Sequence, residues 1–433
     1  MKRGSWTTLT VALLLTCILG IGVTVSAAET TTIRFFHTFW VPEMLEILGE
    51  AINRYQVEND GVIVRETRVS WTDASSQLMM SIMGGESPDL IVANPSMVAQ
   101  FRSIGAFAEI GDLMPEELTQ SFSSAALDMM TNPEGKIDGI ANEGCTWGLF
   151  YRSDLFEEAG LNPNSPPETW EELVEFGQKL TKDTSGDGRI DQWGYGWPVQ
   201  AENATDYWEH FMWSAGSEVV SYENGEWLSH LTEEPAVTGT QFMVDLIHKY
   251  KISPFGLVDM NWEDVTNGFV QGNFAMMHNG AWVVGSVAQK GPDIEGQWGT
   301  APIFAGPAGR VNRGHPNTFH ILKASDKREQ TWDFVEFLYT EGRKPELSYM
   351  EEIAESGAAL IWTDHYIDYA RRTYPELALP FVDSHVTSQI PPLDPRWETL
   401  TVMFGDAAIQ ELLMTNGDVK EMLKMLEARL NRL

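Results

Sequence analysis

The chain has 433 residues, of which 43% are hydrophobic and 21% are charged, and its formal net charge is −33. Because single domains mostly span about 100–200 residues, this length predicts two lobes. The acidic charge argues against nucleic acid as a partner, since nucleic acid binding depends on Lys and Arg, and it disfavours anionic membrane surfaces.

Residues 1–28 have the pattern of a secretory signal peptide: a basic start, an apolar run at Leu9–Val25 and the small residues Ser26-Ala27. We therefore expect export across the cytoplasmic membrane to the periplasm or the extracellular space. Cys17 lacks the small preceding residue that lipid attachment usually requires, so we expect no lipid anchor. If Cys17 leaves with the signal, Cys145 is the single thiol and no disulfide can form within the chain.

Strands and helices alternate at the start of the mature chain. Thr32–His37 is typical of a strand, and Pro42–Tyr55 has a helical apolar face that begins at a Pro. Val62–Val69 predicts a second strand, Asp73–Met83 a second helix, and Pro88–Ala93 a buried parallel strand. This order indicates an open α/β sheet, in which ligands bind beyond the carboxyl ends of the strands.

The later segments continue this pattern. Helices are predicted at Trp170–Thr181 and Glu234–Tyr250, and a short strand at Phe274–Met277. The C-terminal third is mostly helical, and Asp418 is the predicted cap of a last amphipathic helix. We find no internal repeat and no low-complexity segment.

Several motifs, in a fixed order over nearly all of the mature chain, carry a family resemblance. They are GKIDGI at Gly135–Ile140, LFYRSDLFEEAGL at Leu149–Leu161, PPETWEEL at Pro166–Leu173, FVQGNFAMMHNGAW at Phe269–Trp282, WGTAP at Trp298–Pro302 and WDFVEFL at Trp332–Leu338. Together they resemble the extracellular solute-binding protein family 1, the maltose-binding-protein-like sugar-binding proteins of ABC importers.

The resemblance implies an α/β fold of two lobes with a ligand cleft between them and three crossovers. The implied N-lobe is 29–142 plus 318–358, and the implied C-lobe is 143–317 plus 359–433. The crossovers are expected near Asn142–Thr146, Pro316–Phe319 and Ser356–Trp362. The implied function is non-catalytic: a monomer captures a sugar between its lobes and delivers it to the membrane permease subunits of an ABC importer. We expect the sugar to be a neutral oligosaccharide, because the chain is acidic and rich in Trp.

Trp282 is the strongest candidate ligand contact, because the flat C–H faces of sugars stack on aromatic rings while polar side chains bond the hydroxyls. The resemblance implies that the Trp at this position faces the sugar. Asn279 begins the Asn-Gly turn before Trp282 and is a candidate with it. For Trp282 the alternative is a Trp of the core.

Other candidates follow the predicted strands. Phe39 and Trp40 come after the first strand. Trp71 ends the second strand and is followed by Asp73. The alternative for this pair is a helix cap next to a Trp that packs in the core. Asn94 ends the third strand, although an Asn before Pro also makes turns.

The implied crossovers supply the remaining candidates, because both lobes meet the ligand there. Glu143 and Trp147 lie at the first crossover, His315 and Asn317 at the second, and Trp362 at the third. Each of these side chains has a purely structural role as its alternative.

The loop that contains Asp183, Ser185, Asp187, Arg189 and Asp191 matches most of a calcium-binding loop. The twelfth position holds a Gly rather than the bidentate Glu, so a solvated turn is the alternative. No cofactor is required by the function implied above, and a calcium ion here would be structural.

Two rival functions stay open. A binder of glycerol phosphate or another anionic sugar derivative would need Arg or Lys at the cleft, and Arg310 and Arg313 are the candidates. A secreted glycosidase needs only two carboxylates. The sequence has no G-x-S-x-G, no H-E-x-x-H and no phosphate loop, so we expect that the protein is not an enzyme.

Overall fold

A computed structural model describes residues 30–39, 42–200, 204–223, 226–340, 348–356, 363–373 and 376–433. The predicted signal peptide lies outside these residues, as do Trp40, Trp362 and most of the third predicted crossover. Within the described ranges, no helix is both long enough and apolar enough to cross a membrane.

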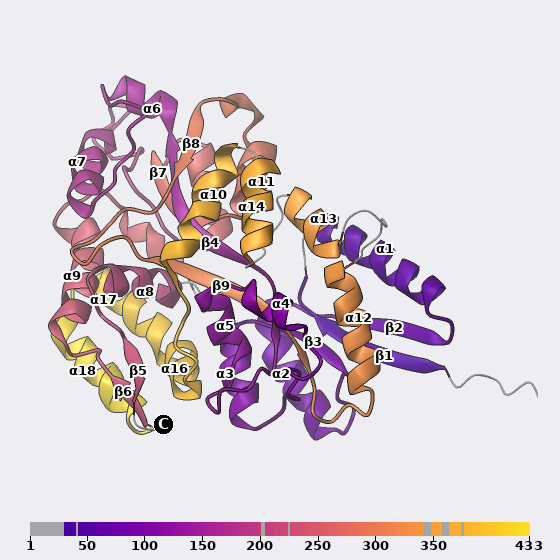
Figure 1. Ribbon diagram of the computed structural model, residues 1–433. Coiled ribbons are helices and arrows are strands. Elements are labelled where there is room, and N and C mark those ends of the chain that lie inside the picture. Colours follow the sequence, from indigo (N-terminus) through magenta and orange to yellow (C-terminus); the bar gives the residue numbers. More distant parts are fainter. Residues whose placement is uncertain are drawn as a thin grey trace, which may run out of the picture.

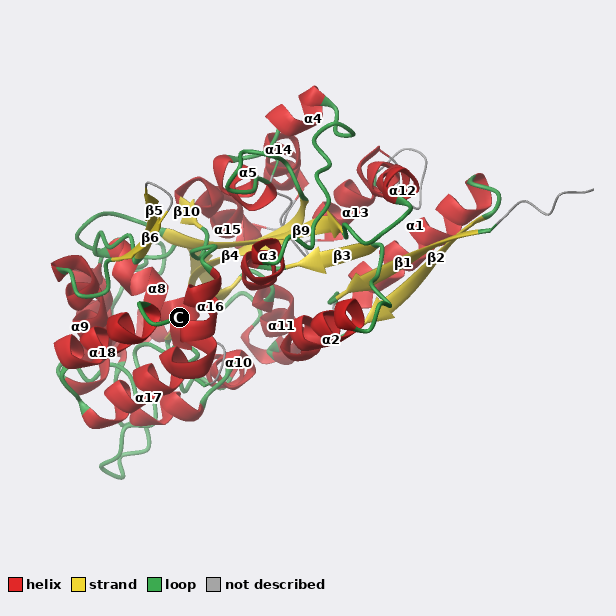
Figure 2. Cartoon of the chain, turned by 90° about the horizontal axis from the view of Figure 1, so that it is seen from below, coloured by secondary structure: helices red, strands yellow, loops and turns green. Residues whose placement is uncertain are grey.

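The N-lobe contains a parallel sheet in the order β2-β1-β3, with helices on both faces (Figures 1 and 2). The strands are β1 (Thr31–His37), β2 (Val62–Arg68) and β3 (Leu90–Ala93). The helices are α1 (Pro42–Glu58), α2 (Trp71–Met83), α3 (Pro95–Ser103), α4 (Glu116–Gln120), α5 (Ser124–Met130), α12 (Arg328–Thr340) and α13 (Tyr349–Ser356).

Side chains alternate across the sheet, so its two faces have separate cores. Ile33 and Phe35 of β1 pack with α1, α12 and α13 on one face. Phe36 packs with α2 and α3 on the other face. The alternating strand and helix pattern therefore correctly predicted a sheet covered on both sides.

Two long strands join the N-lobe to the C-lobe. They are β4 (Ile140–Arg152) and β9 (Asn312–Ile321), and they pair antiparallel with each other. β9 also pairs with β3 of the N-lobe, whereas the second half of β4 pairs with β7 (Met276–Gly280) and β8 (Trp298–Ala301) of the C-lobe. The sheet is thus continuous between the lobes, in the order β2-β1-β3-β9-β4-β7.

The C-lobe is mostly helical and is packed around aromatic side chains. Its elements are α6 (Ser153–Glu158), α7 (Trp170–Leu180), α8 (Ala204–Ser214), β5 (Val220–Glu223), β6 (Glu226–Ser229), α9 (Glu234–His248), α10 (Trp262–Val270), α11 (Val283–Lys290), α17 (Asp406–Thr415) and α18 (Val419–Leu430). Trp197, Trp208 and Trp213 are buried in this core, and Trp208 Nε1 donates to Thr240 Oγ1 at 2.8 Å.

The chain between the α13 and α17 helices returns to the junction of the two lobes. It contains α14 (Asp364–Thr373), α15 (Leu379–Asp383), β10 (Ser388–Gln389), α16 (Pro395–Leu400) and a π-helical turn at Thr401–Gly405. β10 pairs with β9, and α16 packs against α3 of the N-lobe. The lobe boundaries at 142/143, 317/318 and 358/359 stay predictions.

Candidate ligand-binding site

A buried charged cluster lies on one face of the crossing strand β9. The guanidinium of Arg313 is 2.7 Å from Asp206 Oδ1 and 3.0 Å from Glu209 Oε2, both on α8. It also lies over the Trp147 ring, with Cζ 5.0 Å from the ring centroid. Glu209 in turn accepts a 2.9 Å hydrogen bond from Trp397 Nε1 of α16. The cluster therefore joins β9, β4, α8 and α16.

The positive charge of this cluster is neutralised within it. Burial opposes the charge of Arg313, but Asp206 and Glu209 outweigh burial and raise the pKa of the guanidinium. Burial raises the pKa of Glu209, and Arg313 acts in the opposite direction. One guanidinium thus faces two carboxylates, so the cluster does not offer a free positive charge to an anion.

Aromatic rings adjoin the charged cluster. The rings of Trp147 and Trp282 meet edge to face with centroids 5.2 Å apart, and His315 stacks on Trp147 at 6.1 Å. Burial and then Arg313 lower the pKa of His315 to about 3, so this ring is neutral at pH 7. A Cβ added to Gly280 would collide with the Trp282 ring, so Gly280 leaves room for that ring.

A second polar group lies where β4 is irregular. The register of β4 with β9 shifts between Ala141 and Gly144, which takes Asn142 and Glu143 out of the regular pairing. Asn317 Nδ2 of β9 donates to Glu143 Oε1 at 2.6 Å. Burial raises the pKa of Glu143 to about 7, partly offset by the hydrogen bond from Asn317.

Several buried polar atoms near this irregularity lack partners within the described residues. They are Asn142 Nδ2 and Oδ1 and Asn317 Oδ1. Native proteins rarely leave such groups unpaired, because each unmade hydrogen bond costs about 1–3 kcal/mol. Together with Glu143 these amide groups supply both donors and acceptors, the combination that hydroxyl groups of a ligand require.

The structure brings four predicted ligand contacts together with Trp282. Glu143, Trp147, His315 and Asn317 all lie on the paired strands β4 and β9, and Trp147 touches Trp282. Cys145 pairs with His315 between them and is partly exposed. These residues occupy alternate positions, so their side chains share one face of the strands. This face is the candidate site.

For three other predicted contacts the geometry favours the structural interpretation. Phe39 is buried in the N-lobe core. Asn94 accepts from Met97 N at 2.9 Å and so caps α3. Asn279 is buried, and its amide donates to the Trp262 carbonyl and Thr266 Oγ1, both at 3.2 Å.

Two further predicted contacts lie at the start of α2, at the carboxyl end of β2. Trp71 is half-buried against the N-lobe core. Asp73 is exposed and accepts from Ser70 Oγ at 2.8 Å, within the N-cap of α2. The role of Trp71 and Asp73 as ligand contacts stays a prediction. Trp40 and Trp362 lie outside the described residues.

Sequence reasoning missed Asp206 and Glu209. A signal was present, because these carboxylates are three positions apart in a helix that is otherwise rich in buried aromatic residues. Acidic residues are almost never buried without a partner, so they point to a buried cation, which the structure identifies as Arg313.

The loop around Asp187 closes by hydrogen bonds. Asp183 accepts from Gly186 N at 2.6 Å and Gly188 N at 2.7 Å, and Asp191 accepts from Thr184 N at 2.8 Å. In the described part of the chain no three His, Cys, Asp or Glu side chains are grouped to hold a metal. Calcium binding by this loop stays a prediction.

The model of the bacterial extracellular solute-binding protein family matches residues 42–344. The chain belongs to this family. A putative binding protein of Brucella abortus is 25% identical over 378 residues, which cover 87% of this chain and 86% of that protein. The lactose-binding protein of Rhizobium radiobacter is 22% identical over 338 residues, covering 74% and 72%.

Solved structures confirm the predicted two-lobed fold of this solute-binding protein. An ABC transporter solute-binding protein from Thermotoga lettingae, bound with α-D-tagatose, superposes with a TM-score of 0.77 at 20% identity. The match covers 93% of this chain and 99% of that one. The family and these similar proteins are named for binding, not for catalysis.

Proposed function

We propose that this solute-binding protein captures a neutral sugar, of more than one ring, on the face formed by Glu143, Trp147, Trp282, His315 and Asn317, and delivers it to an ABC importer. The observation that carries the proposal is the contact of Trp147 with Trp282, together with the buried, unpaired amide atoms of Asn142 and Asn317 on the same paired strands β4 and β9. Aromatic rings take the C–H faces of a sugar, and the polar groups take its hydroxyls.

The charge of the site favours a neutral ligand over a phosphate. Arg313 is held by both Asp206 and Glu209, and the carboxyl group of Glu143, whose pKa is raised to about 7, supplies no positive charge. A phosphate would have to displace these carboxylates or be repelled by them. Lactose-binding and tagatose-bound proteins among the similar proteins support a sugar in this cleft.

The two-lobed fold supplies a mechanism for delivery. Because β4 and β9 connect the lobes and carry the site, a sugar that contacts both lobes favours the closed arrangement by its additional contacts there. The permease subunits would then recognise the closed form. No catalytic step is needed, since the ligand leaves unchanged.

The test is a thermal-shift screen of the mature protein against neutral mono- and oligosaccharides, sugar acids and glycerol 3-phosphate. A ligand at about 100 times its Kd stabilises the folded state by about 2.7 kcal/mol, which gives a clear rise in Tm. We expect a neutral sugar to raise Tm and to be recovered intact by chromatography. A rise in Tm with glycerol 3-phosphate or sugar acids alone would instead support a binder of anionic ligands. Cleavage of the sugar would instead support an enzyme that acts on it.

A further inference from the structure

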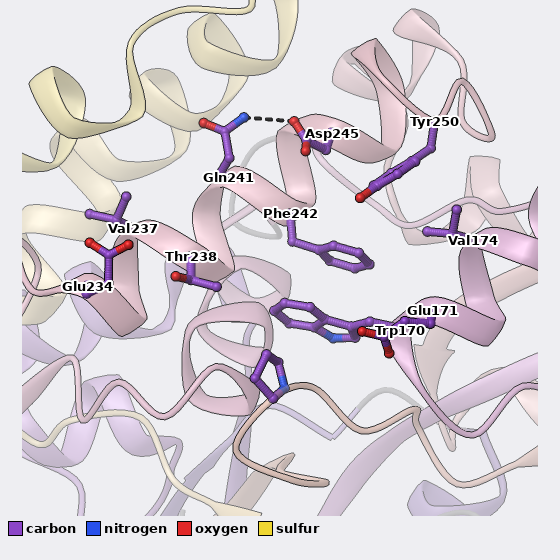
Figure 3. Close-up of a pocket in the computed structure, with 11 residues that line it drawn as sticks. Trp170, Glu171, Val174, Glu234, Val237, Thr238, Gln241, Phe242, Asp245 and Tyr250 are labelled. Atoms are coloured by element: carbon purple, nitrogen blue, oxygen red, sulfur yellow. Dashed lines mark hydrogen bonds between the residues drawn. The ribbon is translucent and has the colours of Figure 1, made fainter.

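A cavity lies on the outer surface of the C-lobe, between α7 and α9, on the side turned away from the N-lobe (Figures 1 and 3). Its volume is about 590 Å³, which is within the range of small-molecule sites. None of its lining residues belongs to β4 or β9 or to the site described above. The cavity is therefore separate from the candidate ligand-binding face on β4 and β9.

One wall of this outer cavity is aromatic. Trp170 and Phe242 stack with centroids 4.0 Å apart and planes within 5°, and Tyr250 follows at 6.1 Å from Phe242 with its ring tilted by 54°. Figure 3 shows the three rings side by side, with Val174 next to them. Phe242 and Tyr250 are half-buried, and Lys249 Nζ lies over the Tyr250 ring at 4.8 Å from its centroid, so the remaining ring surface is what an occupant can contact.

The neighbouring wall is polar and acidic: Gln241 and Asp245 line it together with Glu171 and Glu234. Gln241 Nε2 donates to Asp245 Oδ1 at 2.8 Å, and Lys249 Nζ donates to Asp245 Oδ2 at 3.2 Å. Lys249 Nζ also lies 3.3 Å from Tyr250 Oη. The network fixes donors and acceptors next to the aromatic wall before any ligand arrives.

We propose that this outer cavity is a second saccharide-binding site, which takes one or two neutral sugar rings. The rings of Phe242 and Tyr250 offer apolar surface for C–H groups, and Gln241, Asp245 and Tyr250 offer hydrogen-bond partners for hydroxyls. An anion is disfavoured because no Lys or Arg lines the cavity. Asp245 is already paired with Lys249, but Glu171 and Glu234 also line the cavity, so an organic cation is the competing occupant that tetramethylammonium tests.

The buried Trp170 gives a local reporter for this site. Its side chain is only 4% exposed, and its indole Nε1 has no hydrogen-bond partner within the described residues. The ¹⁹F resonance of 5-fluorotryptophan at position 170 reports on the environment of this ring. It is assigned as the resonance that is missing from the spectrum of Trp170→Phe. The experiment uses the mature protein with Trp282→Ala, so that binding at the Trp147–Trp282 face is weakened, and a shift of the Trp170 resonance that is unchanged from the Trp282 protein reports on the outer cavity alone.

The probes are lactose, maltotriose and cellotetraose, with tetramethylammonium and glycerol 3-phosphate for comparison. We expect at least one sugar to move the Trp170 resonance in a saturable way, with a Kd of about 1 mM or below. Tyr250→Ala should weaken that binding by about tenfold or more, because it removes the open ring. Gln241→Ala should also weaken the binding of that sugar, and it leaves the hydrophobic core unchanged because Gln241 is exposed.

Tyr222→Ala is the matched control, because Tyr222 is an exposed Tyr on β5 that does not line the cavity. It should leave the Kd unchanged. The proposal is overturned if none of the three sugars moves the resonance, if tetramethylammonium or glycerol 3-phosphate moves it instead, or if Tyr250→Ala and Tyr222→Ala have equal effects.

Discussion

Asn317 of β9 donates a 2.6 Å hydrogen bond from Nδ2 to Oε1 of Glu143, and this bond joins the two crossing strands where β4 is irregular. Burial raises the pKa of Glu143 to about 7, whereas an unfolded Glu titrates at about 4.3. The folded protein therefore holds this proton more firmly than the unfolded chain. Its stabilising contribution is complete below the unfolded pKa and is lost as the pH rises through the folded pKa.

The pH dependence of stability should consequently differ between the protein and Glu143→Gln. We expect the free energy of unfolding of the unchanged protein to fall, relative to that of Glu143→Gln, by about 3 kcal/mol between pH 4 and pH 7.5. Urea unfolding at a series of pH values measures this difference. Parallel pH profiles for the two proteins would show that Glu143 is not held in its protonated form.

Replacement of Arg313 should destabilise the C-lobe. Arg313→Ala leaves Glu209, which is 1% exposed, without its cation, and breaking a buried pair in this way costs about 3–5 kcal/mol. Arg310→Ala is the matched control in the same segment, and a change of about 0.5 kcal/mol or less is expected there. Denaturant unfolding measures both variants, and equal effects would contradict the structural role of the Arg313 cluster.

Trp282 should contribute to affinity for the sugar identified by the screen. Trp282→Ala removes the ring that meets Trp147, and we expect the Kd to rise by about tenfold or more. Gly280→Ala should have a similar effect without touching the ligand, because the new Cβ displaces the same ring. Calorimetric titration measures both, with Trp227→Ala on β6 as a matched control that keeps the original Kd.

The loop around Asp187 should keep its shape without calcium. Asp183 and Asp191 already accept hydrogen bonds from backbone N–H groups, which lower the pKa of both carboxyl groups. Removal of calcium with EDTA is therefore expected to leave Tm unchanged. A rise in Tm on addition of calcium, absent in Asp187→Asn, would instead identify a structural calcium site.

Local sequence patterns predicted the N-lobe well, because its elements have strong start and stop signals. The predicted helix at Pro42–Tyr55 is α1 with its end extended to Glu58, and α2, capped by Ser70, begins at Trp71, two residues before the predicted start at Asp73. The C-lobe strand predicted at Phe274–Met277 is in fact β7 at Met276–Gly280. All residues of β7 are buried, so no alternation of apolar and polar residues marked its ends.

The candidate site could be predicted only in part. The resemblance led to Trp282, and the position of the crossovers led to Glu143 and Asn317. The pairing of Arg313 with Asp206 and Glu209 joins residues about a hundred positions apart, and no local pattern predicts such a contact. Asn94 was predicted from the end of a strand and Asn279 from the turn before Trp282, and helix caps and buried amide networks use the same residue type at such places.

The measurement that tests the account most directly is the reaction rate of Cys145 with a maleimide, in the mature protein with and without the sugar found by the screen. Cys145 lies between Glu143 and Trp147 on β4 and is partly exposed, so a bound sugar should cover it. We predict that a saturating concentration of the sugar slows the reaction by about tenfold or more. An unchanged rate at a sugar concentration that raises Tm would show that the sugar binds elsewhere, and it would contradict the assignment of this face as the ligand-binding site.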